Sequence, residues 1–162
     1  MAKAKDKDNK TNVMRLLEQA GIPYTPHTYD PEGPIDGVSV AAILGQDAEC
    51  VFKTLVTRGA SGAYYVFDIP VAENLDLKKA AKAVGEKSVE MVKSKELLGL
   101  TGYIHGGCSP IGMKKLFHTV VDETVLLSET MIFSAGKVGY QVEVTPDILA
   151  QMIPYEIADL TM

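Results

Sequence analysis

The stretch CVFKTLVTRGASGAYYVFDIP, residues 50–70, gives the strongest signal for the fold class. Two segments, residues 50–58 and 63–69, are rich in β-branched and aromatic side chains, which favour strands. They are separated by residues 59–62, with Ser61 and Gly62 at the tip. A short connection containing glycine between two such segments is typical of a β-hairpin. We therefore predict an antiparallel pair of strands here.

Helices and further strands are predicted on both sides of this hairpin. The helices follow from apolar residues at helical spacing, polar caps and glycine stops, and the strands from runs of β-branched and aromatic residues. Their order follows no strict β-α-β repeat. We predict a single-domain α+β fold, residues 11–162, with one mixed, curved, barrel-like sheet surrounded by short helices and preceded by a disordered leader, residues 1–10. The predicted helices are 12–20, 38–44, 76–84, 94–98 and 146–152, and the other extended segments are 22–29, 88–92, 117–121, 130–133 and 140–144.

Composition narrows the class of protein. With 162 residues, 46% apolar and 23% charged, the chain is typical of one globular domain. Its apolar runs are shorter than the roughly 20 residues that span a bilayer. The N-terminus alternates lysine with aspartate and has no apolar segment, which argues against a secretory signal and for a cytoplasmic protein without a membrane partner.

Charge argues against a protein that neutralises many phosphates, since the net charge is -5. Six lysines nevertheless fall within residues 78–95. They form either a solvated helix face or a local basic patch for one nucleic-acid end, and the sequence leaves both readings open.

The cysteines and histidines show no catalytic or metal-binding arrangement. Cys50 and Cys108 are far apart and form no CxxC pair, so free thiols are expected and neither a metal nor a cofactor is predicted. No serine or cysteine has a recognisable adjacent base, which disfavours a hydrolytic triad. Cys108 is the only plausible nucleophile.

Lys53 is a charge within a hydrophobic strand. Alternation places it on the same face as Val51 and Leu55. Desolvating an ammonium group is costly, so a lysine on an apolar face is usually paired or functional. The alternative is an edge lysine whose ammonium reaches solvent along its own aliphatic stem.

Two glycine-containing segments are candidate ligand loops. TGYIHGGCSP, residues 101–110, contains a glycine pair before a proline, so its backbone amides could approach an anion or oxyanion without side-chain obstruction. A plain tight turn is the alternative. SAGK, residues 134–137, resembles the end of a phosphate loop but lacks the first glycine at the required spacing. A hairpin turn is the better interpretation of that segment.

Taken together, several segments resemble the YbaK/EbsC family of bacterial Cys-tRNA(Pro) deacylases, which are related to the editing domain inserted in many bacterial prolyl-tRNA synthetases. The resemblance extends over about residues 12–160. Its most specific parts are VFKTL at 51–55, LDLKKAAKAVG at 75–85, TGY at 101–103, GGCSPIG at 106–112 and the turn at 134–139.

The resemblance implies a trans-editing enzyme that removes mischarged cysteine from tRNA, with the 3′-aminoacyl end of tRNA as its substrate and prolyl-tRNA synthetase as a partner. In this family the substrate's own thiol is thought to attack the ester carbonyl, so the protein mostly positions and polarises. The implied catalytic residues are Lys53, Gly106 and Gly107, and the implied substrate-binding residues are Tyr29, Cys108, Ser109, Pro110, Ser134 and Gln141.

Of the two departures from the family pattern, at Gln141 and Cys108, the one at Gln141 matters for the chemistry. Gln141 stands where members often carry an aspartate, so a charge partner for the lysine or the substrate could be missing. Two alternatives therefore remain open: a deacylase for another mischarged tRNA such as Ala-tRNA(Pro), and a non-catalytic module that binds aminoacyl-tRNA or a synthetase. DNA is not an expected partner.

Overall fold

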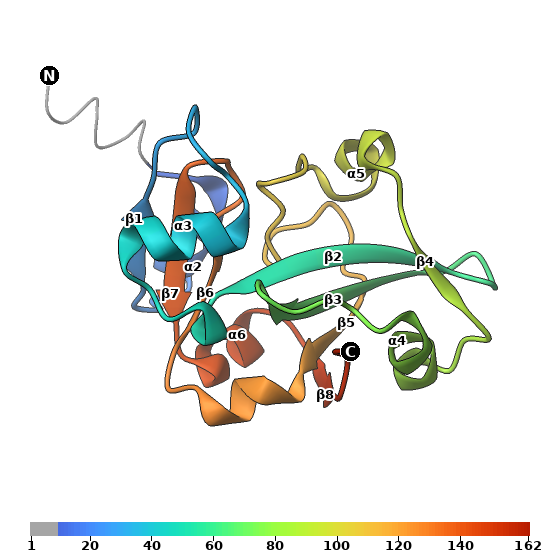
Figure 1. Cartoon of the computed structure of the whole chain (residues 1–162). Helices are drawn as coiled ribbons and strands as arrows, with labels where there is room; N and C mark the ends of the chain where they lie inside the picture. The colour runs from blue at the N-terminus through green and yellow to red at the C-terminus, as the bar shows by residue number, and fades with distance from the viewer. Residues whose placement is uncertain (1–9) are drawn as a thin grey trace, which may run out of the picture.

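The computed structural model describes residues 10–162, which form an α+β domain with two β-sheets (Figure 1). The larger sheet has the strand order β4-β2-β3-β5-β8, and the smaller has the order β1-β7-β6. The α+β prediction is confirmed. The strands are β1 Thr25–Thr28, β2 Phe52–Gly59, β3 Tyr64–Pro70, β4 Val89–Met91, β5 His118–Asp122, β6 Met131–Ser134, β7 Tyr140–Val144 and β8 Glu156–Ala158.

The predicted hairpin forms the centre of the larger sheet. β2 and β3 are antiparallel from Phe52 opposite Pro70 to Arg58 opposite Tyr64. Gly59 N–H closes the turn by donating to the Ala63 carbonyl at 2.7 Å. β4 adds antiparallel to β2, whereas β5 and β8 add parallel on the other side.

The sheet is not closed into a barrel, so this part of the prediction is wrong. β7 pairs with β1 on one side and with β6 on the other, and these three strands form a separate antiparallel sheet. The two sheets meet at one parallel bridge, between Val51 and Ile132. β8, which was not predicted, lies at the outer edge beside β5. Its three residues, Glu-Ile-Ala, are too few to show an alternating pattern.

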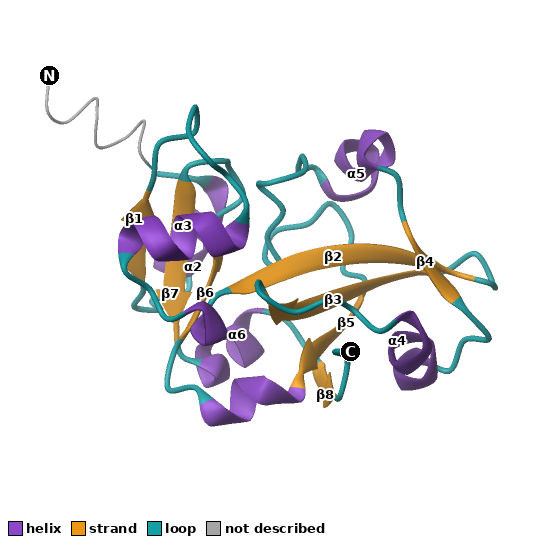
Figure 2. Ribbon diagram, viewed as in Figure 1, coloured by secondary structure: helices purple, strands orange, loops and turns teal. Residues whose placement is uncertain are grey.

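The five predicted helices are present, with ends fixed by capping (Figure 2). The Thr11 hydroxyl accepts from Met14 N–H at 3.2 Å, and the Asp36 and Asp76 carboxylates cap the next two helices in the same way. The bounds are α2 Asn12–Gln19, α3 Gly37–Leu44, α4 Leu77–Val84, α5 Ser94–Thr101 and α6 Pro146–Met152, with two 3-10 turns at Ala48–Cys50 and Glu123–Leu127. None of the helices within residues 10–162 has the length and apolar character to cross a bilayer.

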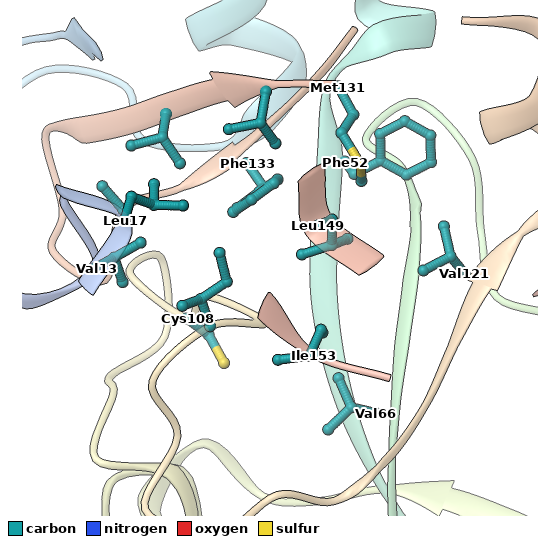
Figure 3. Packing of buried hydrophobic residues seen from close by; sticks show 14 of the residues in the cluster. Val13, Leu17, Phe52, Val66, Cys108, Val121, Met131, Phe133, Leu149 and Ile153 are labelled. Carbon is teal, nitrogen blue, oxygen red and sulfur yellow. The ribbon is translucent and has the colours of Figure 1, made fainter. Parts of the chain in front are cut away.

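The main core joins the two sheets into one body (Figure 3). Leu17 of α2, Phe52 of β2, Phe133 of β6 and Leu149 of α6 are all at most 2% exposed. Because they come from both sheets and from both ends of the chain, their packing fixes the position of β6 and β7 relative to β2.

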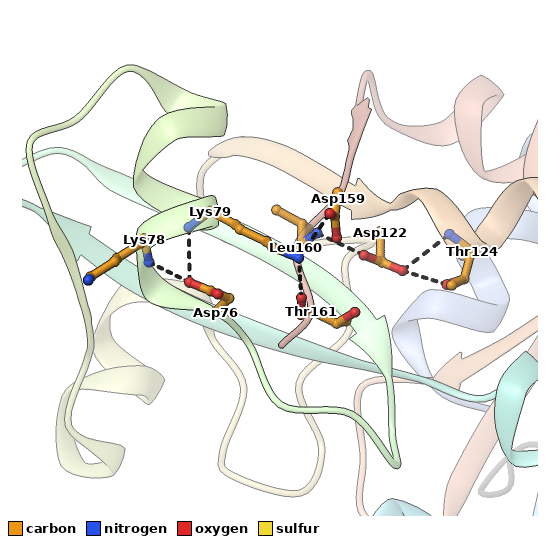
Figure 4. A network of polar contacts seen from close by, with 8 residues as sticks. All are labelled: Asp76, Lys78, Lys79, Asp122, Thr124, Asp159, Leu160 and Thr161. Carbon is orange, nitrogen blue, oxygen red and sulfur yellow. Dashed lines mark hydrogen bonds and ion pairs between the residues drawn. The ribbon is translucent and has the colours of Figure 1, made fainter.

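A network of polar contacts fastens the C-terminal residues to α4 and to the end of β5 (Figure 4). Asp122 accepts from Leu160 N–H at 2.9 Å, and Leu160 O accepts from Asp76 N–H at 2.8 Å. Lys79 of the lysine-rich stretch donates to Asp159 at 2.9 Å and to the Thr161 carbonyl at 2.7 Å. This lysine therefore has a structural contact.

Candidate functional site

A cavity of about 340 Å³ opens along one edge of β2, between the two sheets and the loop that follows α5. Its volume is within the range of small-ligand sites. The lining comes from five parts of the chain. They are Tyr29, Ile35, Asp36, Gly37, Val38 and Val40; Val51 to Leu55 with Val71; Leu97; His105, Gly106 and Cys108; and Phe133, Ser134 and Gln141.

The floor of the cavity is a short unpaired edge of β2. Along the edge of β2 that faces away from β3, Val51 forms a bridge with Ile132 of β6, and Thr57 pairs with Met91 of β4. The Val51 carbonyl accepts from Val71 N–H at 2.8 Å on the β3 side, and the Val56 carbonyl accepts from Val92 N–H at 3.1 Å on the β4 side. Since backbone groups alternate along a strand, those of Thr54 point to the same side of β2 as the Val56 carbonyl, toward the cavity.

Lys53 is half-buried and lines the cavity together with Val51 and Leu55. Burial lowers the pKa of its ammonium group, and the negative charge of Glu73 partly opposes this effect. Within the part of the chain that the structure describes, the ammonium has no hydrogen-bond or ion-pair partner. An unpaired cation in a concave site can bind an anionic ligand group.

Cys108 also reaches the cavity, with 8% of its surface exposed. Burial raises the pKa of its thiol to about 12, and the nearby Asp68 carboxylate contributes to the rise. A thiol attacks as the thiolate. Cys108 is therefore protonated and poorly nucleophilic at neutral pH.

The glycine loop touches the cavity only in part. Gly106, at φ 88°, lines it. Gly107 packs against the β6–β7 turn, where an added Cβ would lie 3.1 Å from Val138 N, and its own N–H donates to the Ile104 carbonyl at 3.0 Å. The Gly107 amide is therefore hydrogen-bonded within its own loop and does not point to a ligand in the cavity.

The predicted site residues divide into two groups. Those that the fold brings together around the cavity are Tyr29, Lys53, Gly106, Cys108, Ser134 and Gln141. Gly107, Ser109 and Pro110 do not line it. The buried Ser109 hydroxyl instead accepts from Ile111 N–H at 3.3 Å, and Pro110 borders a separate, smaller depression.

Ser134 and Gln141 face each other across the β6–β7 hairpin that was predicted at this turn. The Ser134 hydroxyl accepts from Gly136 N–H at 3.1 Å. The Gln141 side-chain oxygen accepts from the Gln46 amide at 2.8 Å, so Gln141 is held in place by a neutral partner. Gln46 was not predicted, because no local pattern relates it to a residue 95 positions later.

Thr54 and Asp68 were also missed. Thr54 lines the cavity, and its hydroxyl donates to the Asp68 carboxylate at 2.5 Å. Asp68 lies in the apolar run Tyr64–Pro70. This is the same signal that identified Lys53, so the sequence did carry it.

These features define a class: an α+β domain with a small, mostly apolar pocket, one unpaired cation and polar backbone on the pocket floor. Within residues 10–162 no group of three or more histidine, cysteine, aspartate or glutamate side chains could hold a metal ion.

The chain belongs to the family described as "Aminoacyl-tRNA editing domain", whose sequence profile matches residues 36–152. It is 44% identical, over 99% of its length and 98% of the relative's, to a protein of Enterococcus faecalis named "Putative Cys-tRNA(Pro)/Cys-tRNA(Cys) deacylase EbsC". The family predicted from the sequence is confirmed, and the match agrees with the predicted activity class, an aminoacyl-tRNA deacylase.

Solved structures share the fold. A crystal structure titled "putative trans-editing enzyme for prolyl tRNA synthetase" superposes with a TM-score of 0.81 at 24% identity, covering 94% of this chain and 98% of that one. A hypothetical protein of known structure gives a TM-score of 0.84 at 22% identity, covering 94% of this chain and all of the other.

Proposed function

We propose that this protein is a trans-editing deacylase that releases cysteine from mischarged tRNA, with Cys-tRNA(Pro) as the principal substrate. The observation that carries the proposal is the unpaired, half-buried Lys53 in the cavity at the edge of β2. The name of the 44% identical relative supports the choice of amino acid and tRNA.

In this mechanism the Lys53 ammonium binds negative charge at the acylated 3′ end, either a phosphate or the oxyanion that develops on the ester carbonyl. Partial desolvation strengthens this interaction, because the same charge interacts more strongly where water is displaced. Tyr29, Ser134 and Gln141 on the cavity wall orient the aminoacyl group.

The substrate supplies its own nucleophile. The cysteine sulfur attacks the ester carbonyl, the bond to the 3′-oxygen breaks, and the thiol proton ends on that oxygen, giving a cyclic thiolactone and free tRNA. Cys108 is not needed for this step, in keeping with the raised pKa of its thiol. Gly106 is the residue of the predicted catalytic pair whose backbone lies on the cavity wall.

Turnover of Cys-tRNA(Pro) by catalytic amounts of protein tests the proposal. Lys53→Ala is expected to abolish turnover, whereas Cys108→Ala keeps most of it. Lys10→Ala removes an equal charge from an exposed ion pair with Glu18, and serves as the matched control. An active Lys53→Ala protein would refute the role of Lys53.

The choice of amino acid and the partner have their own tests. If alanine- or serine-charged tRNA(Pro) were hydrolysed as fast as the cysteine form, the thiol mechanism would be wrong. We further propose that the protein acts in the cytoplasm and that prolyl-tRNA synthetase contributes tRNA selection. Adding the synthetase should then increase the preference for tRNA(Pro) over tRNA(Cys), and an unchanged preference would exclude that contribution.

A further inference from the structure

Asp68 of β3 is a fully buried carboxylate beneath the cavity, with 0% of its surface exposed. Its Oδ1 atom accepts the Thr54 hydroxyl at 2.5 Å. Its Oδ2 atom has no hydrogen-bond partner in the described part of the chain. Buried carboxylates normally satisfy both oxygens, so a structural role alone explains this residue poorly.

Thr54 connects Asp68 to the cavity. The two residues are directly opposite in the β2–β3 ladder, and Thr54 lies on the unpaired edge of β2. A hydroxyl has one proton and two acceptor lone pairs. Because the proton of Thr54 is committed to Asp68, the hydroxyl can act toward a ligand only as an acceptor.

We infer that Asp68 is a positioning residue for deacylation, which holds the Thr54 hydroxyl as a hydrogen-bond acceptor for the substrate's aminoacyl group. This inference rests on the proposed function. The cysteinyl ester offers two suitable donors, the thiol S–H and the α-ammonium N–H. An acceptor at Thr54 would orient whichever of them reaches the floor, while Lys53 binds negative charge elsewhere in the same cavity.

The arrangement depends on the ionisation of Asp68. Burial raises the pKa of its carboxyl to about 7, and the hydrogen bond from Thr54 partly opposes the rise. A protonated Asp68 no longer requires the Thr54 proton, so Thr54 loses its fixed acceptor orientation as pH falls below about 7. This predicts lower activity on the acid side.

The other titratable groups around Asp68 do not replace it. Cys108, from the loop, is protonated at neutral pH. Lys53, on β2, belongs to the opposite face of the strand from Thr54. Asp122, on β5, accepts from Thr124 and from Leu160 N–H. The Asp68 carboxylate is therefore the charged group that contacts the Thr54 hydroxyl directly.

Steady-state kinetics on Cys-tRNA(Pro) with four variants test the inference. Asp68→Leu and Thr54→Val should each lower kcat by about tenfold at pH 8 with little change in KM, the loss expected for one hydrogen bond to the reacting group. The double variant should be no worse than either single one. Asp68→Asn, which cannot ionise and is neutral like the protonated aspartic acid, should show the low acid-side rate at every pH and so abolish the fall in rate below pH 7.

Thr57→Val is the matched control, because Thr57 is a buried threonine of the same strand whose hydroxyl donates to the Tyr65 carbonyl at 3.2 Å, outside the cavity. It should leave kcat within twofold. Wild-type kinetics for Asp68→Leu or Thr54→Val, additive losses in the double variant, or an unchanged pH profile in Asp68→Asn would each overturn the inference.

A readout without substrate separates this inference from the proposed function. In protein with ¹³C-labelled aspartate carboxyls, Asp68 should titrate near pH 7, and Thr54→Val should raise its pKa because the hydrogen bond that favours the carboxylate is lost. An unshifted titration would refute the coupling even if deacylation proceeds. Absence of deacylation with a shifted titration would instead refute the proposed function alone.

Discussion

The wild-type protein is expected to become less stable as pH rises, because of Asp68. The Asp68→Asn variant should not show this decrease. Burial raises the pKa of Asp68 from 3.8 to about 7. Between these values the folded state keeps a proton that the unfolded state releases, so the free energy of unfolding falls with increasing pH. Above pH 7 the accumulated loss is about 4 kcal/mol, at about 1.4 kcal/mol for each pKa unit.

Urea denaturation of both proteins at pH 5 and pH 8 measures this effect. Integrating the proton difference over that interval gives a decrease of about 3 kcal/mol for the wild type that Asp68→Asn does not share. The amide has nearly the same size, so packing is retained, and all other titrating groups are common to both proteins. Parallel pH dependences for the two proteins would refute the assignment of a raised pKa to Asp68.

Three further changes have outcomes set by the geometry. Gly106→Ala should lower the free energy of unfolding by about 1–2 kcal/mol in thermal denaturation, because φ is 88° and the new Cβ would lie 3.1 Å from Ile35. Gly99→Ala is the control: this glycine lies on α5 with open space around it, so the change should be neutral or stabilising. Lys53→Met should raise the melting temperature while abolishing turnover, since the folded state disfavours the charged ammonium; a lower melting temperature would contradict this. Leu149→Ala, at a fully buried position, should cost about 2–5 kcal/mol in urea denaturation, and a cost below 1 kcal/mol would show that the core of α6 is not packed as described.

The parts of the fold that the sequence predicted are those with local signals. Asp36 and Asp76 cap helices within three residues of themselves, and the turn at 59–62 is determined by its own residues. The division into two sheets depends on the bridge between Val51 and Ile132, which are 81 positions apart and carry no mark of the pairing. Sequence periodicity therefore predicted the strands but not which sheet each one joins.

The same distinction applies to the site. Lys53 was found because a charge within an apolar strand is visible in the sequence itself. Asp68 carries the same signal, but its significance depends on Thr54 lying opposite it, which the register of β2 and β3 decides. Gly107 was assigned a role from its place beside Gly106, whereas the structure uses its amide within the loop.

The unpaired edge of β2 has a consequence for solubility. An exposed strand edge can recruit a strand from another molecule and so begin aggregation. Here the open part is confined to residues 52–55, between the bridge to Ile132 and the hydrogen bond from Val92 to Val56. Strands typically pair over five or six residues, so four residues set at the bottom of a cavity admit a small molecule but exclude a neighbouring chain. The protein can thus expose backbone to its ligand without offering other molecules an edge on which to assemble.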